Sequence, residues 1–517
     1  MLRLSQIALP LEADERALAG HIARKLDIAP ERIRDVHVVR RALDARHKPR
    51  LLRIVTADFA VDDEEALLRN ASVPQLTRAP EEAPLELVRA HRPGRVLVVG
   101  MGPAGLFAAW RLAEGGMQVT LIERGRPVDE RALAVERFWR DGLLDGDSNV
   151  QFGEGGAGAF SDGKLTTRLT GTGVREVLSR LVLCGAPDDI LVEAHPHIGT
   201  DRLRRVLVRL REKLEALGVT IRFSACLTGI SAFGARINDC EEFGCDALVL
   251  ACGHSARDTV QMLHASGVAL APKAFAVGLR VEHPAELINT IQWGVPRVRG
   301  LDAADYHLSH TNRSTGRGVY SFCMCPGGFV IAASSEYDHL VVNGMSHHAR
   351  DNAFSNSALV VTVRPEDFPD EHPLSGIAFQ REWERRAFTV GGGGYYAPAQ
   401  NLLSFLKRGS GPVRSSIRPG FREADLARTL PAFVVRELRE ALPYFNRLMP
   451  GFVTREATLV GIESRTSAPF RILRDERGAS ISHPWLYPAG EGAGYAGGIV
   501  SSAADGLKAA GHILETF

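Results

Sequence analysis

Three short apolar runs, each closing on glycine, are the clearest feature of the hydrophobic pattern. "VLVVG" ends at Gly100, "ALVLACG" at Gly253 and "LYPAG" at Gly490. Apolar runs of this length are consistent with strands buried on both faces. The first and the last are followed by helical spacing, and "QVTLIE" supplies a further strand that ends at Glu123. Strands that alternate with helices indicate βαβ units, so the pattern predicts an α/β fold with a Rossmann domain.

Residues 266–455 follow a different pattern. "KAFAVGLRVEHP" alternates apolar and polar residues as a half-buried strand does, and "YSFCMCPGGFVIAAS" and "ALVVTV" predict further strands. "PLSGIAFQREWERRAF" has helical spacing. This segment therefore predicts a β-rich α+β domain, and in proteins of similar architecture such a domain covers the substrate site. It is inserted into the α/β domain, whose two parts are expected at residues 94–265 and 456–517.

Residues 1–90 predict a small α+β module. "EADERALAGHIARKL" has helical spacing, "RDVHVVRRALDA" and "LLRIVTADFAV" are β-rich, and the Pro-rich "TRAPEEAPLELVRAHRPG" indicates a linker. Between Arg24 and Arg53, ten Lys and Arg stand against four Asp and Glu, a surplus of six. This surplus either binds RNA or a protein partner, or is a solvated face balanced by the acidic "VDDEEALL". We favour the second interpretation, so nucleic acid is not an expected partner.

Bulk composition narrows the class of protein. A chain of 517 residues with 45% hydrophobic and 24% charged residues is ordinary for a soluble protein of several domains. A net charge of +1 provides no field that recruits nucleic acid or an anionic membrane. No apolar run reaches the roughly 18 residues that span a bilayer. The seven cysteines are scattered and odd in number, which argues against a disulfide framework and predicts a cytoplasmic protein.

The strongest motif is "GMGPAG", which lies between the first predicted strand and its helix. Gly100 permits a tight turn, Gly102 lets the backbone approach a pyrophosphate, and Gly105 lets helix and strand pack closely. The helix N-terminus then offers free N–H groups to the phosphates. Glu123 follows about twenty residues later, where a carboxylate accepts hydrogen bonds from ribose hydroxyls. This context predicts a dinucleotide cofactor, either NAD or FAD.

Two further glycine-rich stretches decide between the cofactors. "NVQFGEGGAGAFSDGKL" carries more glycines than packing requires, which indicates a flat ring lying on the backbone, and Lys164 is placed to stabilise a reduced flavin. The late strand of "YPAGEGAGYAGGI" is followed by Gly490 and Glu491. This order of motifs is that of flavoprotein disulfide reductases and their hydroxylase relatives, although they usually have Asp at the second position. The expected cofactor is therefore FAD.

From residue 100 to residue 499 the chain resembles the uncharacterised bacterial FAD-dependent dehydrogenases. The segments that carry the resemblance occur in consistent order: "GMGPAGLFAA", "SNVQFGEGGAGAFSDGKL", "PHIGT", "GHSARDT", "YSFCMCPGG", "NGMS", "APAQ", "GIESRTSAP" and "YPAGEGAGYAGGI". The resemblance implies a glutathione-reductase-like FAD domain, a family-specific C-terminal domain and a small N-terminal module. It implies no substrate.

These motifs give a set of residues expected to contact FAD. They are Gly100, Gly102, Pro103, Ala104, Gly105, Glu123, Arg124, Arg131, Gly156, Ala157, Gly158, Ser161, Asp162, Lys164, Leu227, Ala251, Cys252, Gly253, Gly490, Glu491, Gly498 and Ile499.

Cys323 and Cys325 lie in one predicted strand. Residues two apart on a strand face the same side with Cα atoms roughly 6.6 Å apart, close to the upper limit for a disulfide of about 6.8 Å. The pair is interpreted as buried apolar filler, a flavin-linked dithiol, or a single thiol in the substrate pocket. No CxxC pattern accompanies it, so no metal site is expected.

Two further residues are candidates for catalysis. His254 follows Gly253 directly and is a candidate acid or base near neutral pH. Arg465 in "GIESRTSAP" is a candidate clamp for a substrate carboxylate, with an internal pair to Glu463 as the alternative.

The prediction is an FAD-dependent dehydrogenase that moves a hydride or an electron pair between a small organic substrate and flavin N5. Because only one dinucleotide fingerprint exists, NAD(P)H is expected to bind transiently, and oxygen or a quinone is an alternative acceptor. An NAD(P)H-dependent monooxygenase remains an alternative. A flavoprotein whose FAD is structural, with the basic module docking onto RNA or a protein, is another.

Overall fold

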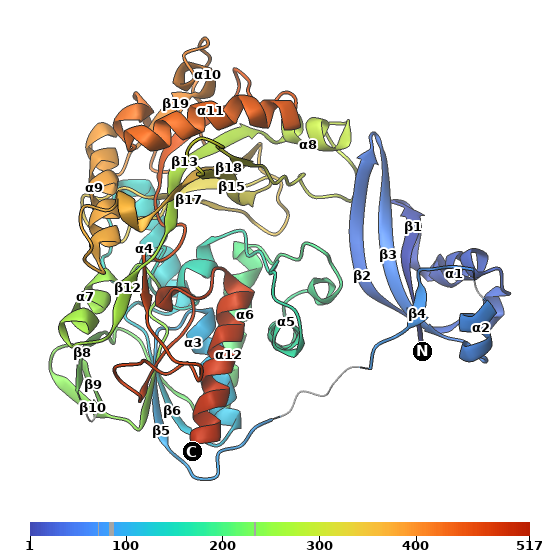
Figure 1. The fold of residues 1–517 in the computed structure, drawn as a ribbon, viewed down its shortest axis with the longest axis horizontal. Coiled ribbons are helices and arrows are strands. Elements are labelled where there is room, and N and C mark those ends of the chain that lie inside the picture. Colours follow the sequence, from blue (N-terminus) through green and yellow to red (C-terminus); the bar gives the residue numbers. More distant parts are fainter. Residues whose placement is uncertain (71, 82–86, 232–233) are drawn as a thin grey trace.

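The computed structural model describes residues 1–70, 72–81, 87–231 and 234–517. An α/β part lies below a β-rich part, and the N-terminal module stands at the side of both (Figure 1). Residues 82–86 of the predicted linker lie outside the described residues. Within the described part of the chain, no helix is both long and apolar enough to span a membrane.

The α/β part contains a five-stranded parallel sheet in the order β23-β11-β5-β6-β7. The apolar runs predicted as strands are therefore confirmed, and all lie side by side. The strands are β5 (Arg95–Val99), β6 (Gln118–Ile122), β7 (Thr220–Arg222), β11 (Ala247–Leu250) and β23 (Leu486–Pro488). The order brings the C-terminal ends of β5, β11 and β23 to one edge of the sheet, where ligands of open α/β sheets bind.

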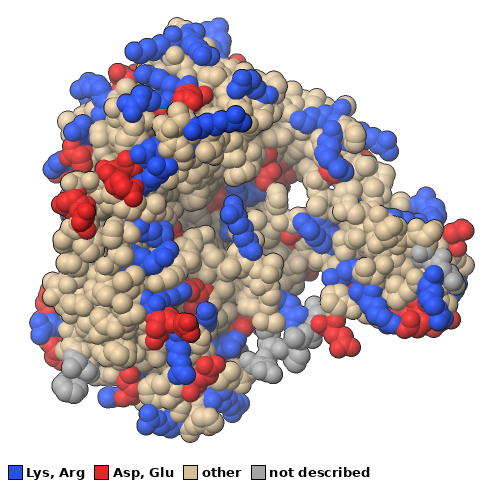
Figure 2. All heavy atoms as spheres, viewed as in Figure 1, with Lys and Arg blue, Asp and Glu red and all other residues tan. Residues whose placement is uncertain are grey.

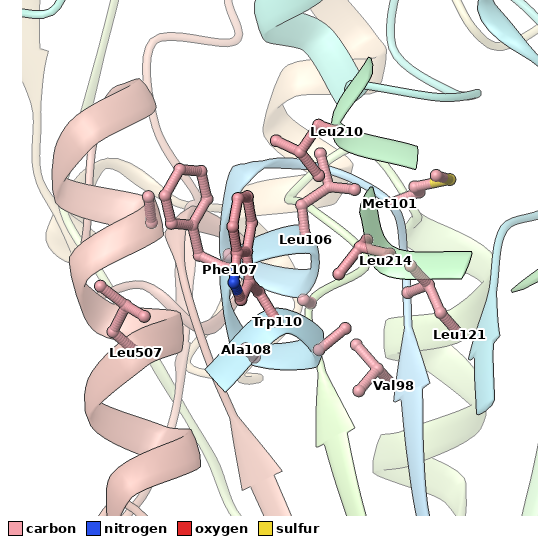
Figure 3. Packing of buried hydrophobic residues seen from close by; sticks show 14 of the residues in the cluster. Val98, Met101, Leu106, Phe107, Ala108, Trp110, Leu121, Leu210, Leu214 and Leu507 are labelled. Atoms are coloured by element: carbon pink, nitrogen blue, oxygen red, sulfur yellow. The ribbon is translucent and has the colours of Figure 1, made fainter. Parts of the chain in front are cut away.

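Helix α3 is sandwiched between the sheet and two other helices (Figure 3). Leu507 of α12 faces Phe107 and Trp110 of α3, while Leu210 and Leu214 of α6 lie near the other side of α3. Burying a side chain of this size contributes about 1.5–3 kcal/mol, so this cluster fixes the start of α3 against the sheet. The helices are α3 (Pro103–Glu114), α4 (Val128–Asp141), α5 (Thr172–Leu183), α6 (Thr200–Ala216), α7 (Arg257–Ala265) and α12 (Ile499–Thr516).

An antiparallel sheet of three short strands is attached to the α/β part between β7 and β11. Its strands are β8 (Leu227–Ser231), β9 (Gly234–Ile237) and β10 (Glu241–Gly244), in the order β10-β9-β8. Residues 232–233 lie outside the described residues. Leu227, at the start of β8, is thereby placed beside the nucleotide-binding edge of the main sheet.

The β-rich part, which we call the cap, is built on a seven-stranded sheet in the order β14-β15-β18-β13-β21-β19-β20. Its strands are β13 (Phe275–Pro284), β14 (Ser309–Thr311), β15 (Gly318–Cys325), β18 (Phe354–Val363), β19 (Ala397–Asn401), β20 (Phe421–Glu423) and β21 (Thr458–Glu463). Strands β16 (Phe329–Ala332) and β17 (Val342–Met345) form a separate pair.

Four helices complete the cap. They are α8 (Ala285–Trp293), α9 (Ser375–Val390), α10 (Leu402–Phe405) and α11 (Ala432–Leu448), and α11 lies across the sheet in Figure 1. Because β21 pairs with β13 and β19, the cap sheet extends to Glu463. The chain therefore returns to the α/β part later than residue 456, where we had expected it.

Two chain segments connect the cap to the α/β part, and they pair with each other. Strand β12 (Leu270–Pro272) leaves the α/β part and β22 (Phe470–Ile472) returns to it. They form an antiparallel ladder in which Leu270 lies opposite Ile472 and Pro272 lies opposite Phe470.

The N-terminal module is an antiparallel sheet in the order β2-β3-β1-β4 with two helices. Its elements are β1 (Leu2–Pro10), α1 (Leu18–Leu26), β2 (Arg34–His47), β3 (Arg50–Ala60), α2 (Glu64–Asn70) and β4 (Leu76–Arg78). The predicted helix and the two predicted strands are present. β1 was not predicted.

The basic surplus of the module is partly neutralised by ion pairs. Arg41 on β2 contacts Glu15 at 2.7 Å and Glu193 of the α/β part at 2.7 Å, and Arg34 pairs with Asp62. Figure 2 shows acidic and basic side chains next to one another on this face of the module. This arrangement supports a solvated, balanced surface over a continuous basic patch.

Candidate functional site

A cavity of about 390 Å³ lies at the edge of the parallel sheet and continues to the cap. Loops of the α/β part line one end, including Gly100, Gly102 and Glu123. The cap contributes Phe322 and Cys323 of β15 at the other end. One continuous space therefore joins the predicted nucleotide site to the predicted substrate domain.

The fingerprint loop has the geometry that its three glycines predict. Gly100 has a φ of +99°, and a Cβ there would lie 2.4 Å from the carbonyl oxygen of Ala251. A Cβ on Gly105 would lie 1.9 Å from the carbonyl oxygen of Gly100, so helix and strand pack closely at this residue. A Cβ on Gly102 would meet only Gly156 Cα at 3.9 Å. Packing of the protein therefore does not require glycine at 102, which is consistent with space kept for a ligand.

Helix α3 begins at this open position. Gly102 is its N-cap and provides no side-chain hydrogen bond, while Pro103 stands at the first helical position. Among the described residues, no side chain caps the N–H groups of this first turn at the cavity, as an anion site at a helix N-terminus requires.

Glu123 ties three loops together at the end of β6. Its Oε2 accepts a hydrogen bond from Met101 N at 2.8 Å, and its Oε1 accepts from Gly125 N at 3.0 Å and Gly153 N at 2.9 Å. A carboxylate has about four acceptor positions, so one remains for a ribose hydroxyl. Glu123 thus lines the cavity and also holds the fingerprint loop against the second glycine-rich loop.

The second glycine-rich loop crosses the fingerprint. It contains a short 3₁₀ helix, Gly156–Phe160, and a Cβ on Gly156 would lie 3.1 Å from Gly102 Cα. Gly156, Ala157 and Gly158 line the cavity as expected. Arg131 does not. It is fully buried and donates to the carbonyl oxygens of Asn149, Val150, Gly153 and Glu154 at 2.6–3.2 Å. We expected Arg131 to bind the cofactor, but its guanidinium is used to shape this loop.

The polar residues after this loop line the cavity, but protein groups occupy most of their polar atoms. Asp162 accepts from Arg350 Nη2 at 2.5 Å and from the Ser346 hydroxyl. Burial raises and the Arg350 guanidinium lowers the pKa of the Asp162 carboxyl, and the net shift is downward. Ser161 donates to Gly158 O at 2.8 Å, and Lys164 Nζ donates to Met324 O on β15. Lys164 thereby links the α/β part to the cap strand that carries Cys323.

The remaining loops close the cavity from the other side of α3. Gly253 has a φ of +71°, and a Cβ there would have no described atom within 4 Å. A Cβ on Gly492 would lie 2.7 Å from the Gly253 carbonyl carbon. Gly490 N donates to Asp505 Oδ2 at 2.7 Å, which fixes the turn after β23. Ala251, Cys252, Glu491, Gly498 and Ile499 also line this wall.

His254 lies in the cavity wall, but not as an acid or base that titrates near neutral pH. Burial, together with the guanidinium groups of Arg465 and Arg257, lowers the pKa of His254 to about 3. Its Nε2 lies 3.7 Å from Glu491 Oε1. Burial raises the pKa of Glu491 to about 7. Of these two neighbours, the carboxyl is therefore the group that titrates near neutral pH.

Arg465 reaches the cavity but has few hydrogen-bond donors left for a substrate. Its Nη1 donates to Ser255 Oγ at 3.1 Å and Ser335 Oγ at 2.5 Å, and its Nη2 donates to Glu384 Oε2 at 3.1 Å. Arg465 was expected either to clamp a substrate carboxylate or to pair with Glu463, and it does neither. Its guanidinium lacks the two free donors that a bidentate clamp needs, and its carboxylate partner is Glu384 of α9. Glu463 pairs with Arg280 at 2.9 Å.

Cys323 and Cys325 do not lie in a regular strand. The pairing of β15 with β18 shifts register between Phe322 and Cys325, and Cys323 has a φ of +43°. This is a β-bulge, so the spacing expected for a regular strand does not apply. Cys323 lines the cavity, whereas Cys325 is fully buried behind it.

Most residues that the sequence singled out therefore meet in one place. All expected FAD contacts except Gly105 and Arg131 line the cavity, as do His254, Arg465 and Cys323. Sequence reasoning missed several lining residues that nevertheless fall within the quoted segments, among them Gln151, Phe152, Phe322, Asn343 and Thr466. Thr166 and Cys226 also line the cavity and lie outside those segments.

The site fits a flat, doubly phosphorylated nucleotide. Gly102 and Gly253 leave open space next to backbone, and the N-terminus of α3 lacks a side-chain cap. Among the described residues, no group of three or more His, Cys, Asp and Glu side chains is arranged to hold a metal ion.

The fold and cavity define a flavoprotein of mixed α/β architecture, and comparison with known families identifies its cofactor. A family model described as "FAD binding domain" matches residues 95–146, and one described as "FAD-dependent protein, C-terminal domain-like" matches residues 274–466. A domain of unknown function matches residues 1–60. The cofactor is FAD, and the second family model covers most of the cap.

The chain belongs to the family of FAD-dependent proteins that carry this C-terminal domain. An uncharacterised protein of Clostridium beijerinckii is 44% identical over 528 residues, which cover 100% of this chain and 99% of that protein. Thiamine thiazole synthase of Aeropyrum pernix is 54% identical over only 37 residues, or 7% of this chain and 14% of that protein.

Solved structures resemble the chain only weakly. CtdE in complex with FAD is 11% identical, with 81% of this chain and 83% of that chain covered and a TM-score of 0.33. Tetracycline destructase Tet(51) is 11% identical, with 82% and 83% covered and a TM-score of 0.34. Scores this low carry no argument about mechanism. Family and cofactor together make this chain a FAD-dependent oxidoreductase in the general sense.

Proposed function

We propose that the protein is a FAD-dependent dehydrogenase that moves a hydride or an electron pair between a small organic substrate and flavin N5. One observation carries the proposal. The cavity that begins at the fingerprint, beside Gly102 and Glu123, ends against the cap at Phe322, Cys323 and Asn343. A dinucleotide held with its phosphates at α3 would have these cap residues at the far end of the same cavity.

The chain's own residues provide binding, orientation and exclusion of water. The N-terminus of α3 would bind the pyrophosphate, and Glu123 would bind the ribose with its remaining acceptor position. The segments 156–158 and 490–492, which line the cavity, would lie against the rest of the cofactor. FAD supplies the reversible two-electron chemistry when it is bound.

The cap end of the cavity is expected to select the substrate. It offers an aromatic ring from Phe322, an amide from Asn343 and a thiol from Cys323. Arg465 contributes positive charge, but Glu384 and two serine hydroxyls already bind its guanidinium. A small substrate with neutral polar groups suits this wall better than one that requires a bidentate carboxylate clamp.

Reoxidation of the reduced flavin tests the proposal. The purified yellow protein is reduced anaerobically with dithionite and mixed in turn with a quinone, NAD(P)+ and oxygen. We expect at least one of the first two to reoxidise the protein faster than it reoxidises free reduced flavin. Equal or slower rates with every acceptor would contradict an enzymatic role and favour FAD as a structural element. Rapid reaction with oxygen alone, coupled to hydroxylation of an added substrate, would identify a monooxygenase instead.

A further inference from the structure

The two cysteines of β15 occupy different depths of the same wall. Cys323 lines the cavity together with Lys164 and Glu491, which come from the α/β part. Cys325 is fully buried, and its Sγ donates to Cys323 O at 3.4 Å. One thiol therefore faces the FAD cavity and the other lies directly behind it.

The bulge is what brings the two thiols together. Phe322 pairs with Ala358 and Cys325 pairs with Asn356, so three steps along β15 match two steps along β18. The extra residue is accommodated by Cys323, whose φ of +43° is rare for a residue other than glycine. In this conformation Cys325 Sγ lies 3.4 Å from Cys323 O, and the Cys325 side chain is the largest influence on the pKa of Cys323. Backbone conformations of this kind concentrate at functional sites.

Charged groups from several neighbouring segments surround the pair. Arg280 of β13 donates Nη1 to Cys323 O at 3.1 Å, and Lys164 donates to Met324 O. Negative charge comes from Glu463 of β21 and Glu491 beside Cys323, and from Asp162 near Cys325. Arg280 and Glu463 form a buried pair, so Lys164 is the cation with no carboxylate bound to it within the described contacts.

Because of these surroundings, the pKa of Cys323 shifts in the opposite direction from that of the other buried cysteines. The hydrogen bond from Cys325, followed by the charges of Arg280 and Lys164 acting against burial, lowers the pKa of Cys323 to about 6. The pKa of Cys325 is raised well above its ordinary value by the same hydrogen bond and by burial. Burial raises the pKa of Cys184, Cys226 and Cys245 to about 11 and that of Cys252 to about 12.

We infer that Cys323 and Cys325 form a redox-active dithiol that exchanges an electron pair with FAD. In the step, the Cys323 thiolate and the Cys325 thiol form an S–S bond, and the S–H bond of Cys325 breaks. The two electrons and the one proton released pass to oxidised FAD, which is reduced to its anionic two-electron form. The reverse step restores both thiols. This inference rests on the proposed oxidoreductase function and adds a second site where the electron pair resides.

Counting electrons tests the inference. The holoprotein is oxidised with diamide, freed of reagent and titrated anaerobically with dithionite. FAD and a disulfide each accept an electron pair, so we expect the wild type to take up about four electrons per FAD. Cys323→Ser and Cys325→Ser should each take up about two. A wild-type uptake of about two electrons, with both cysteines alkylated once the diamide-treated protein is unfolded, overturns the inference.

A second measurement requires no variant of the pair. In the thiol form, a Cys323 thiolate in contact with oxidised FAD produces long-wavelength absorption that grows as the pH rises through about 6. Cys240 is exposed and lies outside the cavity lining, so Cys240→Ser is the matched control and should keep both the absorption and the electron count. Absence of pH-dependent absorption together with no recoverable Cys323–Cys325 disulfide peptide also overturns the inference.

Failure of this inference and failure of the proposed function give different results. If the wild type takes up two electrons and an external acceptor reoxidises it rapidly, the proposed oxidoreductase function stands and the redox-active dithiol is refuted. If the wild type takes up four electrons and no external acceptor reoxidises it rapidly, the dithiol is supported and the proposed function is contradicted.

Discussion

Glu123 Oε2 accepts a hydrogen bond from Met101 N at 2.8 Å, and this bond fixes the fingerprint loop to the end of β6. The same side chain also binds Gly153 N at 2.9 Å. One buried carboxylate thus sets the distance between the two glycine-rich loops that line the FAD cavity.

Glu123→Gln should weaken both the loop geometry and the binding of FAD. The amide nitrogen cannot accept a hydrogen bond, so at least one buried backbone N–H loses its partner, at a cost of about 1–3 kcal/mol. We expect a Kd for FAD raised by at least roughly tenfold, measured by flavin fluorescence during titration of the apoprotein. Glu130→Gln, on the exposed side of α4, is the control and should bind FAD as the wild type does.

Gly102→Val should produce folded protein without flavin. Gly102 has a φ of −80° and an extended ψ, which a β-branched residue adopts readily, and a Cβ there meets only Gly156 Cα at 3.9 Å. The new side chain occupies the space expected for the pyrophosphate. Circular dichroism should match the wild type while the visible flavin spectrum is lost. Retained yellow colour at full occupancy would refute the placement of the cofactor.

Gly105→Ala should fail in a different way. A Cβ at this position lies 1.9 Å from the Gly100 carbonyl oxygen, so α3 must move away from β5. We expect destabilisation of about 1–3 kcal/mol, as for overpacking of a core, measured as a shift of the urea midpoint. This variant should lose flavin because the protein is less stable, whereas Gly102→Val should lose flavin while the protein stays folded.

Glu384→Gln should strongly destabilise the protein because it leaves two buried guanidinium groups with only the partly exposed Glu336 as a counter-charge. Glu384 binds Arg257 Nη2 at 2.8 Å and Arg465 Nη2 at 3.1 Å. Removing one partner of a buried ion pair costs about 3–5 kcal/mol, which urea unfolding would detect. Glu382→Gln, on the same helix but paired with Arg386 near the surface, should cost less than about 1 kcal/mol. Equal effects of the two substitutions would contradict this account.

The pH dependence of Glu384 follows from its surroundings. Burial raises and the guanidinium groups of Arg257 and Arg465 lower the pKa of Glu384, and the net shift is downward. The contribution of Glu384 to the free energy of unfolding is therefore fully present above the ordinary carboxyl pKa and is lost as the pH falls through the lowered value. The difference in stability between the wild type and Glu384→Gln should therefore shrink only when the pH falls below the ordinary carboxyl pKa.

Glu491 should behave in the opposite way. Its pKa is raised to about 7 by burial, so the folded protein holds a proton that the unfolded chain releases near pH 4.5. The free energy of unfolding is unaffected below the unfolded pKa and falls as the pH rises from there to about 7, by on the order of 3 kcal/mol. Glu491→Gln removes this loss, so its Tm should exceed that of the wild type at pH 8 and match it at pH 5. Glu476→Gln, at an exposed position nearby, should show no such difference.

The sequence predicted well those features that depend on neighbouring residues. The turn at Gly100, the helix start at Pro103 and the strand that ends before Glu123 all follow from local spacing, and they position most of the cavity. The partners of Arg465 and Arg280 could not be predicted, because Glu384 lies on α9 and Glu463 on β21, and only the folded cap brings them together.

Strand β15, which carries Cys323 and Cys325, shows most clearly what the sequence alone could not predict. Alternation predicts a flat strand through Cys323, but the extra residue opposite β18 becomes visible only when the pairing partner is known. The predicted role of Arg131 was wrong for a similar reason. A basic residue near a nucleotide motif suggests an anion contact, whereas here four backbone carbonyls surround it.

The ladder between β12 and β22 determines how the cap can move. Both connections between cap and α/β part run through this antiparallel pair, from Leu270 opposite Ile472 to Pro272 opposite Phe470. A single-chain hinge rotates about a few backbone torsions, but paired strands resist such rotation because their hydrogen bonds would have to break. Rotation of the whole cap about these connections is therefore opposed, and the cap wall of the FAD cavity is expected to keep its position relative to the parallel sheet.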